Sequence, residues 1–251
     1  MIFYYLLVFV FGAIIGSFLN VVIARGGKES VNGRSRCPKC FAPLLWFELI
    51  PILSFFFQRG RCRHCRAPIS WQYPIVETLT GLLFVLVFWK YSFAATNVFE
   101  ILLALAFFSL LIVVAVRDFY DQEIPNIVYA AIALAFLSLF FDFSWSRFLA
   151  GPILALPFSL LFFGSKGRLM GFGDAKIALA LGWFLGLQGG LVAILLAFWI
   201  GAFIAVILLL TRRQKFRMKS SIPFAPFLVS GAILAFVFSL DFSWLFAIFA
   251  I

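Results

Sequence analysis

The chain alternates between long apolar runs and short polar segments. Most of the apolar runs are long enough to cross about 30 Å of hydrocarbon as an α-helix, and they lack the period-two alternation of a membrane β-barrel. We therefore predict an all-α polytopic membrane protein with about eight transmembrane helices. The predicted helices cover residues 2–23, 74–90, 97–116, 125–141, 148–163, 177–187 with the segment before it, 190–210, and a last one beginning near residue 222.

The first predicted helix has no basic start and no small-x-small cleavage site, so we expect it to remain as a helix and not to be removed as a secretion signal. Near its inner end it carries Gly16, Ser17 and Asn20. Small and amide side chains of this kind favour close helix packing or an interhelical hydrogen bond.

The sixth apolar segment, residues 177–187, is too short to span a bilayer alone. It becomes long enough only if residues 169–174 also enter the membrane, and these include Gly171, Gly173 and Asp174. Irregular backbone at that depth is tolerated only where protein or a water-filled cavity covers it. We therefore expect Asp174 to lie at the membrane edge and to face such a cavity.

Composition excludes a water-soluble globular protein. Hydrophobic residues make up 65% of the chain and charged residues 12%, whereas a soluble domain carries roughly a quarter charged residues. The charges are also unevenly placed, since residues 1–24 contain no Lys or Arg and residues 25–66 contain nine. By the positive-inside rule this loop is cytoplasmic and the N-terminus lies outside.

The same rule places both termini outside, with only Lys90 and Arg147 of the 20 basic residues on the outer side. The net charge of +10 is therefore concentrated in cytoplasmic loops. We expect these loops to meet anionic lipid headgroups, and we do not expect a nucleic-acid partner.

The polar segment after the first helix contains all four cysteines, as Cys37-x-x-Cys40 and Cys62-x-x-Cys65. Two such knuckles about twenty residues apart are typical of a zinc ribbon, in which four thiolates hold one tetrahedral Zn²⁺. The alternative is a pair of disulfides, which would need an oxidising compartment. A four-thiolate site leaves no position for water, so we predict structural zinc, with His64 as a solvated loop residue.

The single histidine, His64, lies in this cysteine loop. A Ser-His hydrolase and a His-Glu-x-x-His metalloprotease are therefore excluded, and no phosphate-binding glycine-rich loop is present. Carboxylate chemistry remains. Two aspartates a few Å apart share a proton, so that one activates water while the other donates to the attacked carbonyl. We predict that Asp118 and Asp174, at the cytoplasmic ends of the third and sixth helices, form this pair.

Glycines at 171 and 173 would allow the backbone to approach an extended peptide closely. Alternatively, Asp174 is a plain N-terminal cap or dipole partner of its helix. The same two alternatives, a dipole partner or a buried functional acid, apply to Glu77 near the start of the second helix.

We predict that the chain has three parts: a transmembrane helix (residues 1–24), a cytoplasmic zinc-binding loop domain (25–72) and a transmembrane catalytic domain (73–251).

The joint order of these motifs resembles the type IV prepilin peptidase family. The resemblance rests on Gly16-Ser17-Phe18-Leu19-Asn20, the two cysteine knuckles, Ile69-Ser70 with Tyr73-Pro74 and Glu77, Asp118 with Ile124-Pro125-Asn126, Gly171-Phe172-Gly173-Asp174-Ala175-Lys176, and Ile222-Pro223-Phe224. It implies a multi-pass protein of the bacterial inner membrane that removes the leader from prepilins or pseudopilins of pilus, secretion and competence systems. It also implies Asp118 and Asp174 as the catalytic pair, and N-methylation of the new N-terminus with S-adenosylmethionine.

The chain departs from the family pattern at two positions. Leu49 follows Glu48 where the family commonly has Asn, in a loop that concerns methylation, and Ala225 stands where the family often has Gly. Asp121 is a local rival to Asp118, but the family spacing to Ile124 favours Asp118. We interpret Asp121 with Glu123 as a solvated acidic face that could attract a basic leader.

Two other function classes fit parts of the pattern. A secondary transporter could use buried acids to carry protons or cations, with the region around Gly171 as a broken-helix binding site. That class requires two halves with matching broken helices, and the second one is not apparent. A zinc-stapled membrane scaffold would need neither aspartate.

Overall fold

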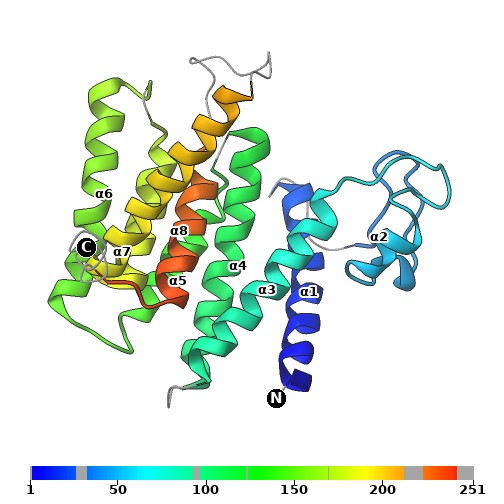
Figure 1. Cartoon of the computed structure of the whole chain (residues 1–251), viewed down its shortest axis with the longest axis horizontal. Coiled ribbons are helices and arrows are strands. Elements are labelled where there is room, and N and C mark those ends of the chain that lie inside the picture. Colours follow the sequence, from blue (N-terminus) through cyan, green and yellow to red (C-terminus); the bar gives the residue numbers. More distant parts are fainter. Residues whose placement is uncertain are drawn as a thin grey trace. The chain divides into compact units, whose positions relative to one another are not determined.

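The computed structural model describes residues 2–26, 33–92, 97–122, 124–168, 170–211 and 223–241. Within these residues the chain is helical, and its only β-type pairs are two isolated bridges, Arg36 with Pro43 and Arg61 with Pro68. The helices are ordered along the chain as Figure 1 shows. The chain divides into two compact units, Met1–Leu105 and Ala106–Ile251, which are described separately below.

The first unit is built on two long helices, α1 (Ile2–Arg25) and α3 (Gln72–Tyr91), which pack along each other. Their close approach depends on glycine, because a Cβ on Gly12 would lie 2.8 Å from the Cβ of Phe84, and one on Gly16 would lie 2.8 Å from the Cα of Glu77. Small residues at such spacing let backbones meet in a membrane. The predicted packing role of this region is therefore confirmed.

Along the chain, the cysteine segment lies between α1 and α3. It holds a short 3₁₀-helix, η1 (Trp46–Leu49), and the short helix α2 (Leu53–Phe57), which contact each other. The unit also includes the first residues of α4 (Val98–Asp121).

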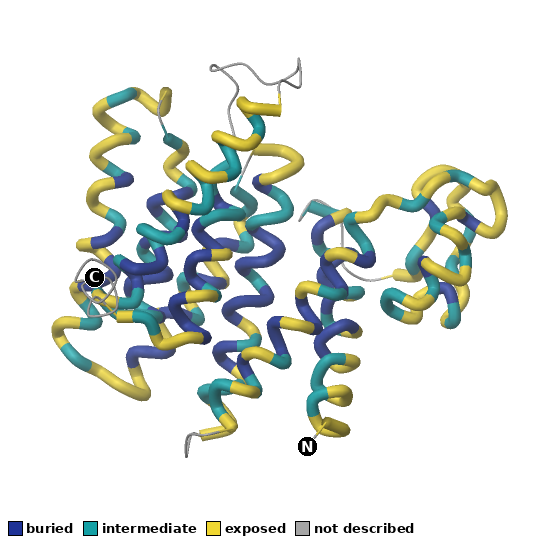
Figure 2. The backbone as a smooth tube through the Cα atoms, in the orientation of Figure 1, coloured by how far each residue is buried: buried dark blue, intermediate teal, exposed yellow. Residues whose placement is uncertain are grey.

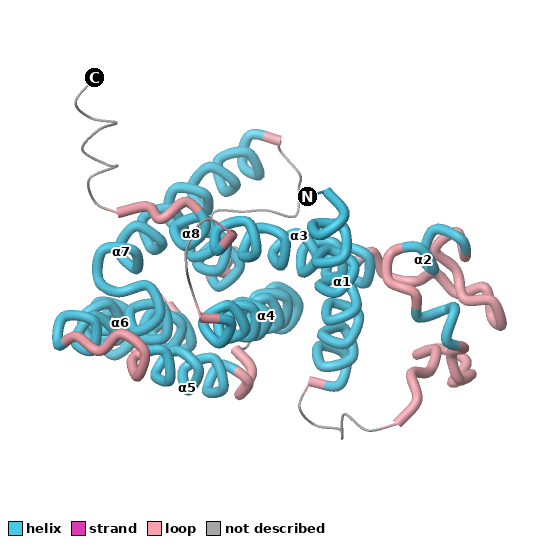
Figure 3. Tube along the Cα trace, turned by 90° about the horizontal axis from the view of Figure 1, so that it is seen from below, coloured by secondary structure: helices cyan, strands magenta, loops and turns pink. Residues whose placement is uncertain are grey.

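The second unit contains the rest of α4 together with α5 (Val128–Ser138), α6 (Trp145–Ser165), α7 (Phe172–Leu210) and α8 (Ala225–Val237). Helix α7 is central, because it packs against α5, α6 and α8 (Figure 3). The largest fully buried side chains of the unit include Phe107, Phe108, Ile177, Leu181 and Leu228. Phe107 stacks on Phe184 with ring centroids 4.1 Å apart.

Helix α7 reverses direction at Gly186, which has φ 75° and ψ −179°. A Cβ on Gly190 would lie 3.6 Å from the Cα of Gly182, whereas residues eight apart in a straight helix are about 12 Å apart. The positive φ is a conformation that glycine adopts at little cost. The predicted sixth and seventh helices are therefore the two arms of α7.

The reversal leaves backbone carbonyls at the end of the first arm, and Arg147 binds them. Its Nε donates to the carbonyl of Trp183 at 3.1 Å and its Nη2 to that of Phe184 at 2.8 Å, while Nη1 donates to Asp142. The indole of Trp183 donates in turn to the carbonyl of Phe148 at 2.9 Å. Helix ends need such partners, so the start of α6 fixes where α7 turns.

Five helices of the described residues are long and apolar enough to cross a membrane: α1, α3, α4, α6 and α7. Many of their large apolar side chains are exposed, among them Phe11 of α1 and Phe203 of α7. Figure 2 shows exposed positions in yellow along these helices. Exposed apolar surface of this extent suits a lipid environment. The all-α membrane architecture with a cysteine loop is confirmed.

Several predicted boundaries were wrong. Helix α5 begins at Val128 and not at 125, because Pro125 and Asn126 form a turn in which the Val128 N–H donates to the Pro125 carbonyl. With 11 residues in α5 and 13 in α8, both are shorter than expected. Helix α4 continues to Asp121, and α7 begins at Phe172. Residue Glu123 and the segments 212–222 and 242–251 lie outside the described residues.

Candidate functional site

Asp118 lies in the last turn of α4 and is 7% exposed. Its Oδ2 accepts a hydrogen bond of 3.1 Å from the backbone N–H of Ala225, the first residue of α8. The contact therefore joins two segments that are 107 residues apart. The donor is a backbone group, so Ala225 makes the same contact that Gly would make at this position. The change from the Gly that the family often has here therefore leaves the hydrogen bond to Asp118 intact.

Asp174 lies in the first turn of α7 and is also 7% exposed. Its backbone N–H donates to the carbonyl of Gly171 at 3.2 Å. The side chain interacts electrostatically with Asp118, so the second unit brings together two buried carboxylates that are distant in sequence. The position in the first turn also suits a dipole partner, and only an activity measurement separates the two interpretations.

Gly173 lies against Ile124, whereas its predicted role in the approach of a peptide stays a prediction. It is part of α7, and a Cβ placed on it would lie 2.6 Å from Cγ1 and 2.7 Å from Cβ of Ile124. A Cβ on Gly171 would meet no atom closer than 3.9 Å, the nearest being Asp174 Oδ2 and the Gly173 nitrogen. The missing side chain at 173 therefore makes room for Ile124, whereas a Cβ at 171 would make only ordinary van der Waals contacts.

We expect Gly173→Ala to destabilise the second unit by about 1–3 kcal/mol, the usual cost of overpacking. Rotation of Ile124 alone cannot relieve the overlap, because the Ile124 Cβ is one of the crowded atoms. Thermal unfolding of purified variants measures the effect. Gly171→Ala is the matched control and should be near neutral, and Ile124→Ala in the Gly173→Ala background should restore part of the loss. Equal stability of the two glycine variants would contradict this packing.

The other acid at this end of α4, Asp121, is paired with Arg117 at 2.8 Å across one helical turn, and its side chain is 41% exposed. On α7, Lys176 donates to the Tyr129 hydroxyl at 2.8 Å and lies over the Tyr129 ring at 4.6 Å from its centroid. Asp121 is thus an exposed, ion-paired residue, unlike the buried Asp118.

The four cysteines lie together as predicted. The Sγ atoms of Cys37, Cys40, Cys62 and Cys65 are all within 4.8 Å of one another, and Cys37 Sγ is 3.9 Å from Cys65 Sγ. Tetrahedral zinc with bonds of about 2.3 Å needs sulfur atoms about 3.8 Å apart, so this set could hold a metal ion. The exposed His64 is not part of the set.

The two knuckles share one backbone geometry. In each, the N–H of the first cysteine donates to the carbonyl five residues later, at 3.0 Å and 2.9 Å. The residue after the second cysteine, Phe41 or Arg66, has φ 57°. The backbone N–H of Cys40 lowers the pKa of the Cys37 thiol to about 7, because it stabilises the thiolate. This favours the form that binds a metal.

Glu77 is a buried acid and not a dipole partner of its own helix. It is the sixth residue of α3, beyond the first turn, and its Oε2 accepts the backbone N–H of Ile52 at 2.7 Å. Ile52 has φ 63°, a strained conformation for a β-branched residue. Glu77 therefore fixes a strained turn of the cysteine segment against α3. The sequence indicated its burial as one alternative but not this partner.

Comparisons with known proteins cover both units. Residues 10–91 match the Bacterial Peptidase A24 N-terminal domain, and residues 105–206 match the Type IV leader peptidase family. A prepilin leader peptidase/N-methyltransferase of Bacillus subtilis (strain 168) is 33% identical over 237 residues, which is 92% of this chain and 93% of the relative. The protein of that name in Aeromonas hydrophila is 34% identical, over 90% of this chain and 87% of its own.

A prepilin leader peptidase/N-methyltransferase of Myxococcus xanthus (strain DK1622) is 37% identical over 214 residues. That match covers 80% of this chain and 62% of the longer relative. No solved structure matches the chain.

Proposed function

Because this chain belongs to the type IV leader peptidase family, we propose that it is a membrane aspartic endopeptidase that removes the leader from type IV prepilins and related pseudopilins. The observation that carries the proposal is the pair of buried, interacting carboxylates, Asp118 and Asp174, in the second unit. In this proposal cleavage takes place at the cytoplasmic membrane boundary.

The proposed hydrolysis needs one proton shared by the two carboxyl groups. The ionised carboxylate takes a proton from water as the water oxygen attacks the scissile carbonyl carbon. The protonated partner donates to the carbonyl oxygen, which stabilises the developing charge. The carbon–nitrogen bond then breaks as the leaving nitrogen takes the proton that the first carboxyl group received from water. The former carbonyl hydroxyl returns its proton to the partner carboxylate, which restores the shared proton. Asp118, held by the Ala225 N–H, is suited to stay ionised, which leaves Asp174 as the donor.

We further propose that the chain N-methylates the new N-terminus. S-Adenosylmethionine would supply the methyl group, and the acceptor nitrogen would release a proton. In the cysteine segment, Cys37, Cys40, Cys62 and Cys65 would hold structural Zn²⁺, whose four thiolate ligands leave no open position for catalysis. The chain is a multi-pass membrane protein of a bacterial family, and we propose that the cysteine loop is cytoplasmic and both termini lie outside.

The direct test is incubation of the purified protein with a prepilin, with and without S-adenosylmethionine, followed by mass measurement of the product's N-terminus. We expect leader removal in both reactions and one added methyl group only when S-adenosylmethionine is present. An intact prepilin, together with proton-coupled uptake by liposomes that contain the protein, would instead favour the transporter class.

A further inference from the structure

The cysteine segment presents an apolar surface that neither the proposed peptidase nor the proposed metal site uses. On α2, the side chains of Leu53, Phe56 and Phe57 are 54%, 59% and 80% exposed. Their spacing of i, i+3 and i+4 places them on one face of the helix. Trp71, which is 61% exposed, adjoins them, because its ring centroid lies 6.4 Å from that of Phe56. These four residues are called the α2 face below.

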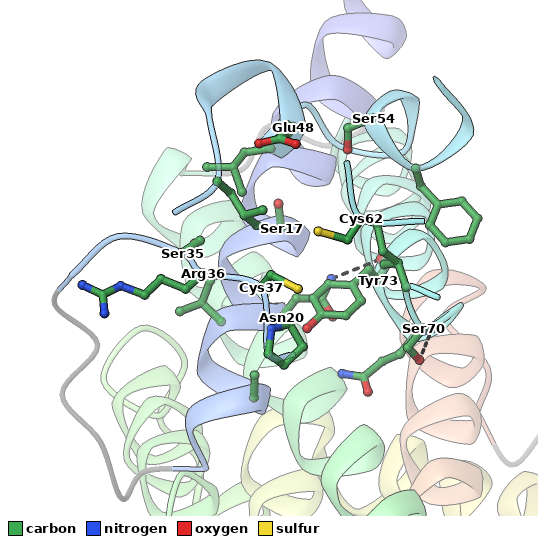
Figure 4. A pocket seen from close by; sticks show the side chains of 18 of the residues that line it. Ser17, Asn20, Ser35, Arg36, Cys37, Glu48, Ser54, Cys62, Ser70 and Tyr73 are labelled. Carbon is green, nitrogen blue, oxygen red and sulfur yellow. Dashed lines mark hydrogen bonds between the residues drawn. The ribbon is translucent and has the colours of Figure 1, made fainter. Parts of the chain in front are cut away.

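The opposite side of α2 is turned towards α1. Phe55 is buried and packs on Trp71 with ring centroids 4.8 Å apart. Together with Ser54 it lines a cavity of about 560 Å³. The other wall of this cavity includes Ser17 and Asn20 of α1 (Figure 4). One side of α2 is thus covered within the first unit, whereas the α2 face is exposed among the described residues.

Two contacts fix the level of α2 along α1. The N–H of Ile52, directly before α2, donates to Glu77 Oε2 at 2.7 Å. On the other side of α3, a Cβ on Gly16 of α1 would lie 2.8 Å from the Cα of Glu77. The start of α2 is therefore within the reach of one glutamate side chain of the level of Gly16.

This level lies within the hydrocarbon layer of a membrane that α1 crosses. Gly16 is nine residues before Arg25, the last residue of α1, which corresponds to about 14 Å of helix. The 24 residues of α1 extend over about 36 Å, so that once the helix fills a hydrocarbon layer of about 30 Å, no more than about 6 Å projects from it. Gly16 is then at least about 8 Å below the membrane face nearest Arg25. Helix α2 therefore begins beside the membrane and not above it.

The exposed charges of the segment fit the same position. Residues 33–71 contain seven basic residues, all of them exposed: Arg34, Arg36, Lys39, Arg59, Arg61, Arg63 and Arg66. The acidic residue of this range, Glu48, is buried. Basic clusters next to a membrane span bind the anionic phosphates of lipid headgroups, and Trp is enriched where headgroups meet acyl chains.

We propose that the α2 face inserts into the interface of an anionic lipid bilayer, at the boundary between headgroups and acyl chains, and that the exposed arginines of the segment bind lipid phosphates. Apolar helix faces enter this boundary to a depth of about 5–10 Å, which agrees with the level of α2. A water-soluble protein is the less suitable partner, because it cannot reach α2 below the membrane face. An apolar peptide helix would leave the arginines without a role.

The proposal changes the expected character of the cysteine segment. The segment is then a second membrane contact of the first unit and not a loop domain surrounded by water. Because α2 holds the segment against the bilayer, the cysteine knuckles stay beside the end of α1. This inference goes beyond the proposed function and does not depend on it.

The direct test replaces Phe57 with the photoreactive residue p-benzoylphenylalanine in the full-length protein, purified with zinc and placed in nanodiscs of phosphatidylcholine and phosphatidylglycerol. After irradiation, mass spectrometry identifies the molecule attached at residue 57. We expect lipid adducts as the main product, with and without prepilin. The same residue at His64, which is exposed but outside the α2 face, is the control and should give at least about tenfold fewer lipid adducts, because only the α2 face reaches the acyl chains.

Hydrogen exchange supplies a second measurement. Phe57→Asp places a charge in the α2 face, whereas His64→Asp places the same charge outside it. Phe57 is too exposed to support the interior, so both variants should fold. In the same nanodiscs the backbone amides of α2 should exchange about 10- to 100-fold faster in Phe57→Asp than in the wild type, because the docked state loses the insertion of one Phe side chain. His64→Asp should match the wild type.

Lipid composition separates the two parts of the proposal. In nanodiscs of phosphatidylcholine alone, α2 of the wild type should exchange faster than in the anionic discs, because the arginines lose their anionic partners. Attachment of residue 57 to prepilin or to a second copy of the chain in place of lipid would overturn the proposal, and so would equal exchange of the two Asp variants. Each of these results would leave the proposed peptidase function intact.

Discussion

Replacing either Asp118 or Asp174 with Asn should reduce leader cleavage by at least about 100-fold, the lower range for loss of a general acid or base. Asn has the shape of Asp but cannot hold or pass the shared proton. Folding should be preserved, because the amide oxygen of the Asp118→Asn variant can still accept the Ala225 N–H that Asp118 Oδ2 accepts at 3.1 Å. The measurement is the rate of prepilin cleavage by equal amounts of purified variant.

The double variant should be no slower than the worse single variant, because residues that act as a unit are strongly non-additive. Asp121→Asn is the control. Asp121 lies one turn beyond Asp118 but is exposed and paired with Arg117, so its loss should change the cleavage rate at saturating prepilin less than about twofold, even if it weakens attraction of a basic leader. Normal cleavage by both single variants would exclude the aspartic mechanism.

Replacing Cys62 with Ser should abolish the proposed zinc binding and disorder the cysteine segment. Binding of zinc contributes about 10–16 kcal/mol in small zinc domains, and the described part of this segment has only short helices of four and five residues to stabilise it. Metal analysis of the purified protein should fall from one zinc per chain to none. Limited proteolysis should then cut within residues 33–71.

His64→Ala is the matched control for this variant. His64 lies in the same knuckle and is exposed, but it does not belong to the four-cysteine set. Its replacement should leave the zinc content at one per chain. Because Asp118 and Asp174 belong to the other unit, Cys62→Ser should impair methylation more than cleavage. Full zinc retention by Cys62→Ser would show that the cysteines do not form the metal site.

Much of the fold follows from the sequence because membrane insertion imposes strong patterns. Length and apolar content predicted α1, α3, α4 and α6 to within a few residues at most ends, since every backbone polar group in lipid must be satisfied within a helix. One of the failures occurred at Pro125 and Asn126, where local turn chemistry decides where α5 begins. The capping of the first arm of α7 by Arg147 depends on tertiary contacts that no local pattern encodes.

The site was predictable to a similar extent. The cysteine spacing predicted the cluster of Sγ atoms, and the scarcity of acids drew attention to Asp118 and Asp174, whose catalytic role stays a prediction. The contact between Gly173 and Ile124 could not be foreseen, because it joins a helix start to a turn 49 residues earlier. The cavity of the first unit was also missed. Asn20, Glu48 and Glu77 come from three separate segments, and only the fold shows that they line one space.

The reversal of α7 limits how far Asp174 can be from the turn at Gly186. Twelve residues separate them, which corresponds to about 18 Å of helix against a hydrocarbon layer of about 30 Å. Arg147 at the turn favours a position near the lipid headgroups for that end. The carboxylate of Asp174 would then lie about 12 Å from the opposite face of the hydrocarbon layer. A substrate whose apolar segment is already inserted can reach this depth by lateral diffusion, whereas a dissolved peptide must first leave water.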